Sequence, residues 1–189
     1  MNRDFVGVLR TLEACSAVKE VSRKGWKKKA KISRPESVAD HIYATTLASM
    51  MVGDLLGLDT EKMMRMALLH DVCEAVTGDI QPGEMEPLWK EKMETSALAA
   101  ILRDLPGSVR AKYLAAFKDF NRGTSREAQI VRDLDKLEMV VQASSYERDG
   151  VRKDLLDEFW KTANERVKTV EGREMLSLAS SLRPRRPAP

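Results

Sequence analysis

The placement of proline constrains this chain more than any other sequence feature. Proline is absent from Glu36 to Gln81 and again from Gly107 to Arg183. Because proline interrupts the hydrogen bonding of a helix interior, these two stretches are free to form long helices. Alternating β-branched residues, the pattern of a half-buried strand, are scarce throughout the chain. The sequence therefore predicts an all-α protein.

Apolar spacing and helix-end signals divide the chain into about six to eight helices. Ser37 and Thr124 each begin a capping box, and Asp59 is a further N-cap candidate. A basic loop separates the first two helices. No repeat or linker is visible, so we expect one helical domain over residues 1–181. The expected helices cover approximately residues 3–18, 38–57, 60–76, 87–105, 108–120, 125–146 and 151–170.

Charge argues against a protein that coats nucleic acid, so a nucleic-acid partner is not expected. The chain has 189 residues and a net charge of +3, but residues 182–189 hold three arginines and no acid, which leaves 29 basic and 29 acidic residues elsewhere. We expect this Pro- and Arg-rich tail to be disordered. The basic segment 19–34 is either a solvated surface or a rim that attracts anions.

Cysteine content and hydropathy indicate a cytoplasmic protein. The chain has two cysteines, Cys15 and Cys73, which we expect to be reduced core residues. The N-terminus lacks the apolar run of a secretion signal. No apolar run reaches the roughly 20 residues that a membrane span needs, so no contact with a membrane is expected.

His41 and His70 are the only histidines, and each has an aspartate as its neighbour. In the helix predicted over 60–76, His70 and Glu74 lie one turn apart on a face that begins apolar, with Asp71 beside them. Buried ionisable groups are costly unless a partner or a cation compensates them, and a divalent metal ion suits this mixture of imidazole and carboxylates. The alternative is that each histidine is an ordinary core residue bonded to the backbone.

Three segments carry a resemblance to a known family. They are RPESVADH at 34–41, ALLHDVCEAVTGD at 67–79 and VRDLDKLEM at 131–139. Together they resemble the HD-domain metal-dependent phosphohydrolases, and more narrowly the HD-domain 5'-deoxynucleotidases. The similarity spans roughly residues 5 to 150 and implies a single HD-domain helical bundle.

The resemblance implies four metal ligands, namely His41, His70, Asp71 and Asp135. Helical periodicity alone does not choose between Asp133 and Asp135, because they flank the apolar stripe of their helix on opposite sides; the family pattern selects Asp135. Two imidazoles and two carboxylates without a thiolate suit one Mn²⁺, Co²⁺, Fe²⁺, Ni²⁺ or Mg²⁺ ion per site. Zn²⁺ could be acquired during purification.

Glu74 and Asp79 match two further acidic positions of the family, which implies catalytic roles. Glu74 is expected to orient or deprotonate the attacking water. Asp79, which follows Gly78, is expected to contact the sugar hydroxyl or assist the leaving oxygen. Asp79 could instead be an ordinary turn residue.

Arg23 and Trp26 resemble the loop with which such enzymes contact phosphate and nucleoside. Lys24 could take the place of Arg23. Trp26 could instead be a core aromatic that anchors the loop, since tryptophan is highly buried on average.

The resemblance thus implies a metal-dependent 5'-nucleotidase that hydrolyses (deoxy)nucleoside 5'-monophosphates. It also implies a homodimer. The helices after Pro87 are one candidate for the dimer interface. One alternative is a hydrolase of guanosine tetraphosphate, which is disfavoured because Ala75 follows Glu74 where those enzymes typically have an aspartate. Hydrolysis of deoxynucleoside triphosphates is typical of longer HD proteins. A further alternative is that the protein is not an enzyme but a module that binds nucleotides.

Overall fold

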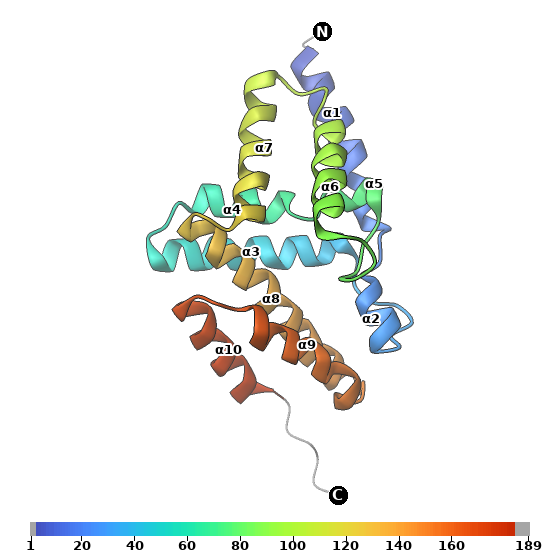
Figure 1. Ribbon diagram of the computed structural model, residues 1–189, viewed down its shortest axis with the longest axis vertical. Helices are drawn as coiled ribbons and strands as arrows, with labels where there is room; N and C mark the ends of the chain where they lie inside the picture. The colour runs from blue at the N-terminus through green and yellow to red at the C-terminus, as the bar shows by residue number, and fades with distance from the viewer. Residues whose placement is uncertain (1–2, 184–189) are drawn as a thin grey trace, which may run out of the picture.

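The computed structural model describes residues 3–183, and all its regular elements are helices, as predicted (Figure 1). Eight of the described helices have ten or more residues, while α2 and α5 are shorter. A 3₁₀ turn, Ala17–Lys19, follows α1. The helices are α1 (Arg3–Ser16), α2 (Lys24–Lys29), α3 (Val38–Leu56), α4 (Thr60–Leu69), α5 (Glu74–Thr77), α6 (Pro87–Ile101), α7 (Gly107–Arg122), α8 (Arg126–Arg148), α9 (Lys153–Arg166) and α10 (Val170–Leu182).

Two apolar cores lie on either side of a central layer made of α3 and α4. In Figure 1, α1, α6 and α7 stand above this layer, and α8, α9 and α10 lie below it. Ile42, Leu98 and Phe117 belong to the upper core. Met63 and Leu134 belong to the lower one. Since α3 and α4 contribute to both cores, polar side chains on these helices can be held between two packed regions.

The start of α3 is fixed as the sequence predicts. Ser37 Oγ accepts from the amide of Asp40, and the Asp40 carboxylate accepts from the amide of Ser37, which completes the capping box. The helix ends at Gly57, which has a left-handed backbone with φ of 63°. His41 is thereby placed in the first turn of a helix whose beginning is closely defined.

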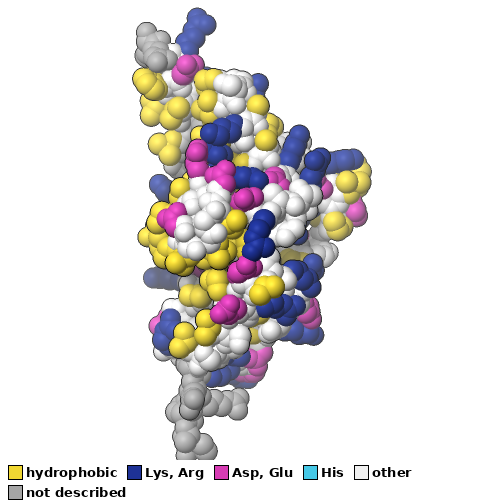
Figure 2. Space-filling view, turned by 90° about the vertical axis from the view of Figure 1, so that its left-hand side faces the viewer, with side chains coloured by type: hydrophobic (Ala, Val, Ile, Leu, Met, Phe, Trp, Pro, Cys, Tyr) yellow, Lys and Arg dark blue, Asp and Glu magenta, His cyan; other side chains and the backbone are white. Residues whose placement is uncertain are grey.

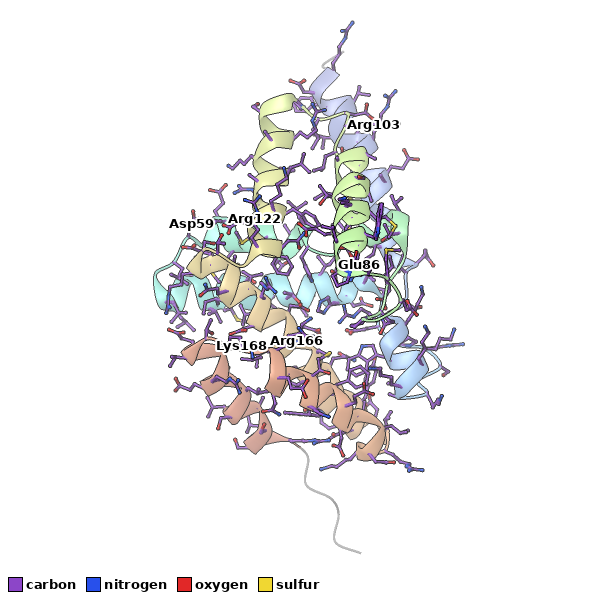
Figure 3. All side chains as sticks on the ribbon, in the orientation of Figure 1. Asp59, Glu86, Arg103, Arg122, Arg166 and Lys168 are labelled. Atoms are coloured by element: carbon purple, nitrogen blue, oxygen red, sulfur yellow. The ribbon has the colours of Figure 1, made fainter. Side chains whose placement is uncertain are left out.

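The starts of α4 and α6 are also as expected. Asp59 accepts from the amide of Lys62 and caps α4. α6 begins at Pro87, and the Glu86 carboxylate accepts from the two amides that follow this proline (Figure 3).

The helix predicted over residues 60–76 is interrupted at His70, so this prediction was wrong in part. α4 ends at Leu69, and several following amides bond to carbonyls three residues back instead of four. His70 Nδ1 donates to the carbonyl of Ala67, the group that the amide of Asp71 would use in a continuous helix. The side chain of His70, the first predicted ligand on this segment, therefore helps to end its own helix.

The long helix predicted after Gly150 is two helices, α9 and α10. The buried carboxylate of Asp133 explains the break, because it accepts from the amides of Lys168 and Thr169 and from Thr169 Oγ1 in the α9–α10 connection (Figure 3). Thr169 then caps α10. One side chain on α8 thus fixes the path of the connection and the start of the last helix.

Two other local predictions need correction. The cap of α8 is Ser125, whose side chain accepts from the amide of Ala128, whereas Thr124 Oγ1 donates to Asp119. The loop predicted around Gly25 contains the short helix α2.

The apolar stripe of α1 does not face the core. Phe5, Val8, Leu9 and Leu12 are 49–68% exposed. Gly7 is the residue that faces the body, since a Cβ there would lie 2.1 Å from the carbonyl oxygen of Asp104. Only glycine permits this close approach, and it leaves the large apolar side chains in solvent.

At the C-terminal end, α10 includes Leu182, and Arg183 donates to Glu147 and Asp157. The rest of the predicted tail, 184–189, lies outside the described residues. None of the helices within 3–183 is both long enough and apolar enough to cross a membrane.

We expect Asp133→Ala to lower the free energy of unfolding by about 2–3 kcal/mol, because it removes the buried carboxylate that accepts from the amides of Lys168 and Thr169 and from Thr169 Oγ1. Urea denaturation would measure this. Asp149→Ala, at the exposed end of the same helix, is the matched control and should change stability by less than about 0.5 kcal/mol. Equal losses in the two variants would contradict the role assigned to Asp133.

Candidate active site

The four predicted ligands come together between the two cores. His41 Nε2 lies 3.2 Å from His70 Nε2, 3.2 Å from Asp135 Oδ1 and 3.8 Å from Asp71 Oδ2. His70 Nε2 lies 3.3 Å from Asp71 Oδ2. These atoms belong to α3, the end of α4, the turn after it and α8. Two imidazole nitrogens and two carboxylate oxygens facing one another are a donor set that divalent metals prefer.

The outer nitrogens of both histidines are occupied. His41 Nδ1 lies 2.5 Å from Glu138 Oε2, and His70 Nδ1 lies 2.7 Å from the Ala67 carbonyl oxygen. Both acceptors require a proton on Nδ1, so the Nε2 atom of each ring is left to face the centre. This is the orientation that a metal-binding histidine needs.

Sequence reasoning missed Glu138, although a signal was present. Glu138 follows Asp135 by three residues on α8, so both carboxylates share a helical face. Glu138 is 9% exposed and reaches His41 from behind. Glu138 contacts the ring of the predicted ligand His41 on the side away from the centre, which is the place of a positioning residue.

The structure separates Asp133 from Asp135. Asp135 faces His41, as the family resemblance implies, whereas Asp133 points to the α9–α10 connection. Two residues apart on a helix, the two side chains leave α8 about 200° apart. Asp133 is therefore buried because it bonds to the α9–α10 connection, and it takes no part in the ligand cluster.

Mutual contact shifts the pKa values of these groups. Burial and the charge of Arg23 lower the pKa of His41, but hydrogen bonds to Asp135 and Glu138 outweigh them and raise it to about 9. Burial opposes ionisation of Asp71, yet His70, His41 and Arg23 hold the pKa of this carboxyl well below its usual range. Without a metal ion, His41 is therefore protonated at neutral pH and pairs with the acids around it.

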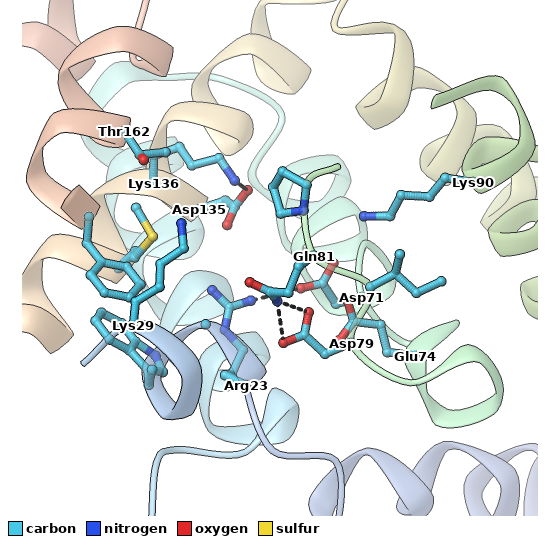
Figure 4. Close-up of a pocket in the computed structure, with 16 residues that line it drawn as sticks. Arg23, Lys29, Asp71, Glu74, Asp79, Gln81, Lys90, Asp135, Lys136 and Thr162 are labelled. Carbon is cyan, nitrogen blue, oxygen red and sulfur yellow. Dashed lines mark hydrogen bonds and ion pairs between the residues drawn. The ribbon is translucent and has the colours of Figure 1, made fainter. Parts of the chain in front are cut away.

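A pocket of about 200 Å³ opens beside these residues (Figure 4). The turn after α4, the α5–α6 connection, α2, α6, α8 and α9 all contribute to its wall. Its lining is strongly charged: the acids are Asp71, Glu74, Asp79 and Asp135, and the cations are Arg23, Lys29, Lys90 and Lys136. A cleft with both signs of charge beside a buried ligand cluster suits a small anionic substrate.

Glu74 lies at the start of α5 and lines this pocket. It is 5% exposed, and its Oε2 has no hydrogen-bond partner within the described chain. Burial, followed by the charges of Asp71 and Asp79, raises the pKa of Glu74 to about 10. An unpaired buried carboxyl oxygen at the edge of a pocket is available to a water molecule or a substrate.

Asp79 is held in place from two sides. Its Oδ2 accepts from the amide of Lys24 at 2.5 Å, and both its oxygens accept from Gln81 Nε2 at 2.7 and 2.8 Å (Figure 4). Gly78, with φ of 69°, supplies the backbone conformation that turns the chain there. Asp79 thus ties the loop before α6 to the start of α2, and it also lines the pocket.

Arg23 and Trp26 have different surroundings. Arg23 Nη1 lies 3.3 Å from Asp71 Oδ2, so its guanidinium borders the ligand cluster. Trp26 is 1% exposed, stacks on Phe159 with ring centroids 3.9 Å apart and donates to Glu36 at 2.7 Å. These contacts match the alternative of a core aromatic that anchors the loop. Lys24 takes part through its backbone amide, as the contact to Asp79 shows.

Comparison with known proteins identifies the family. An HD-domain family model matches residues 15–173, which is most of the chain. The chain belongs to the HD-domain family. It is 35% identical to the 5'-deoxynucleotidase HDDC2 of Mus musculus over 75% of this chain and 70% of that protein. It is 32% identical to the 5'-deoxynucleotidase hdd1 of Schizosaccharomyces pombe over 82% of this chain and 80% of that protein.

A solved structure shares the fold of this chain. A conserved hypothetical protein from Pyrococcus furiosus superimposes with a TM-score of 0.76 at 28% identity, over 93% of this chain and 98% of that one. The HDDC2 and hdd1 matches relate this HD-domain protein, across most of its length, to proteins named as 5'-deoxynucleotidases.

The observed donor atoms fit a divalent metal ion. His41, His70 and Asp71 each offer one ligand atom within 4.8 Å of the others, and Asp135 Oδ1 lies 3.2 Å from His41 Nε2. Glu36, His41 and Glu138 also come together, but there His41 offers the nitrogen opposite the pocket. The first group borders the pocket and is the better candidate for a catalytic ion.

We expect Glu138→Ala to weaken Mn²⁺ binding by about 10- to 100-fold, because His41 loses the acceptor that fixes its ring. Titration of the metal-free protein with Mn²⁺ would measure this. Glu138→Gln is the matched variant, since its amide oxygen can still accept from Nδ1 and should restore most of the affinity. Wild-type affinity in Glu138→Ala would show that the contact does not position the ligand.

Metal binding should release a proton. With the pKa of His41 raised to about 9, the ring is protonated below that pH, and the proton must leave before Nε2 can bind a cation. We therefore expect Mn²⁺ affinity to rise as the pH increases from 6 towards 9. Calorimetry at pH 7 in buffers of different ionisation enthalpy should show about one proton released per ion. A binding enthalpy independent of the buffer would contradict this expectation.

Proposed function

We propose that this HD-domain protein is a metal-dependent 5'-nucleotidase that converts (deoxy)nucleoside 5'-monophosphates to nucleoside and inorganic phosphate. The observation that carries the proposal is the convergence of His41, His70, Asp71 and Asp135 beside a charged pocket that also contains Glu74. The relationship to proteins named 5'-deoxynucleotidases supports the substrate class. The proposed compartment is the cytoplasm.

One divalent ion, held by the four ligands, would polarise the phosphate and supply a water of lowered pKa. Glu74 would orient the attacking water through its buried, unpaired Oε2. It would accept a proton from this water once the charge of the bound divalent ion lowers the raised pKa of the carboxyl. Arg23 would bind a phosphate oxygen from its position beside Asp71. Asp79, held by Gln81 and Lys24, would face the sugar or the leaving oxygen.

Phosphate release from a panel of substrates tests this proposal. The panel contains 5'- and 3'-mononucleotides, guanosine tetraphosphate and deoxynucleoside triphosphates, each with Mn²⁺, Co²⁺, Mg²⁺ or EDTA. We expect turnover of the 5'-monophosphates alone, and EDTA should abolish it. Turnover confined to the tetraphosphate or the triphosphates would overturn the substrate class, and bound nucleotide without turnover would indicate a binding module.

Variants assign the activity to the site. The double variant His70→Ala, Asp71→Ala should be inactive, because it removes two ligands. Glu74→Gln should lower kcat by about 10²- to 10⁴-fold, as expected for loss of a general base, and change KM little. A Glu74→Gln enzyme with the wild-type kcat would exclude the role proposed for this carboxyl.

We also propose a homodimer that covers the apolar face of α1. This face consists of Phe5, Val8, Leu9 and Leu12, all largely exposed. It is accompanied by an apolar groove that α3 and α4 line with Tyr43, Leu47, Met50 and Leu68. In Figure 2, hydrophobic side chains gather below the N-terminal tip and again along the same edge of the middle of the molecule. So much exposed apolar surface is typical of a contact between subunits.

Sedimentation analysis of Leu9→Glu and Trp89→Glu would test this assembly. Trp89, 65% exposed on α6, represents the alternative interface after Pro87. We expect a wild-type dimer, dissociation in Leu9→Glu and no change in Trp89→Glu, because a charge buried in an interface is costly. A dimer that only Trp89→Glu dissociates would move the interface to α6.

A further inference from the structure

Four cationic side chains line the pocket, but their partners differ (Figure 4). Lys29 pairs with Glu158, and Lys90 pairs with Glu94; neither acid lines the pocket. Arg23 and Lys136 pair instead with Asp71 and Asp135, two of the ligand carboxylates. Among the cations that line the pocket, these two are therefore the ones directly beside the ligand cluster.

The two oxygens of Asp135 face different groups. Oδ1 lies 3.2 Å from His41 Nε2, inside the ligand cluster. Oδ2 accepts from Lys136 Nζ at 2.8 Å. A cation bound through Oδ1 leaves the contact between Oδ2 and the ammonium intact. The Lys136 ammonium is thus held one carboxylate group away from the metal-binding atoms.

Lys136 also reaches the pocket itself. Its side chain is 34% exposed, which is more open than the 17% of Arg23. In Figure 4 it extends from α8 along the pocket wall to Asp135. A lysine ammonium has three donors. One is used by Asp135, so two remain for a ligand.

The charges expected at the site indicate what the free donors of Lys136 would bind. The carboxylates of Asp71 and Asp135 together balance a divalent ion. A phosphate monoester then brings a further charge of roughly −1.5 to −2 at pH 7. Arg23 alone cannot balance this charge, because its guanidinium carries one positive charge and also lies 3.7 Å from Glu36. A second cation is needed at the same place, and Lys136 supplies it.

We infer that Lys136 is a phosphate-binding residue that donates to a phosphate oxygen while it holds Asp135, so that Arg23 and Lys136 bind the same phosphate group. This inference rests on the proposed function, because it takes the phosphate of a monophosphate ester as the ligand. It adds a residue that neither periodicity nor the family resemblance assigned.

Inorganic phosphate, the expected product, is the probe. Its affinity for the Mn²⁺-saturated protein is measured by calorimetry in wild type, Lys136→Met, Lys136→Arg and Lys29→Met. We expect Lys136→Met to weaken phosphate binding by roughly 10- to 100-fold, the usual range for a lost charge-assisted hydrogen bond. Lys136→Arg should retain most of the affinity. Lys29→Met, which removes a pocket charge that pairs with Glu158 instead of a predicted metal ligand, should weaken binding by less than about fivefold.

A separate Mn²⁺ titration distinguishes two roles of Lys136, namely binding of phosphate and positioning of Asp135 alone. If Lys136 only positions Asp135, Lys136→Met weakens Mn²⁺ binding but not phosphate binding at saturating Mn²⁺, and the inference is overturned. A wild-type protein that does not bind phosphate overturns it too. Failure of the proposed function is visible separately, as absence of 5'-mononucleotide hydrolysis by wild type.

Discussion

The buried imidazole of His41 connects the parts of the molecule on which the site depends. Through Nδ1 it contacts Glu138 on α8, and through Nε2 it faces His70 at the end of α4 and Asp135 on α8. The capping box at Ser37 fixes its position along the chain. A fully buried imidazole is costly unless both nitrogens have partners, so α3, α4 and α8 must meet in this register. The same contacts leave the inner nitrogens and carboxylates of three segments facing a common point.

The site also shows why the central helix layer is irregular. A continuous helix from residue 60 to 76 would keep the Ala67 carbonyl in the helical ladder and leave His70 Nδ1 without its acceptor. The break at His70 exchanges a regular backbone hydrogen bond for one that orients a ligand. It also begins α5 at Glu74, which places an unpaired carboxyl oxygen at the pocket. The regular helix is thus interrupted at the residues for which catalytic roles are proposed, and the apolar cores on both sides of the α3–α4 layer stabilise this interruption.

Much of this arrangement was predictable, for identifiable reasons. Proline spacing predicted the all-helical fold, side-chain caps predicted the starts of α3 and α4, and Pro87 predicted the start of α6, because such signals depend on neighbouring residues. The division between α9 and α10 depends on Asp133, which lies 35 residues earlier, so local patterns could not show it. The choice between Asp133 and Asp135 likewise needed tertiary contacts or family knowledge. Glu138, Lys136 and the exposed stripe of α1 were missed because helical periodicity shows which residues share a face, but not what that face contacts.

The proposed function requires that Asp135, and not Asp133, complete a metal-binding set with His41, His70 and Asp71. Titration of metal-free protein with Mn²⁺ tests it most directly in wild type, Asp135→Asn and Asp133→Asn, with folding checked by circular dichroism. We predict one ion per chain in wild type, at least tenfold weaker binding in Asp135→Asn and near wild-type affinity in folded Asp133→Asn. Equal affinities in Asp135→Asn and wild type, or no ion bound by wild type, would contradict the account.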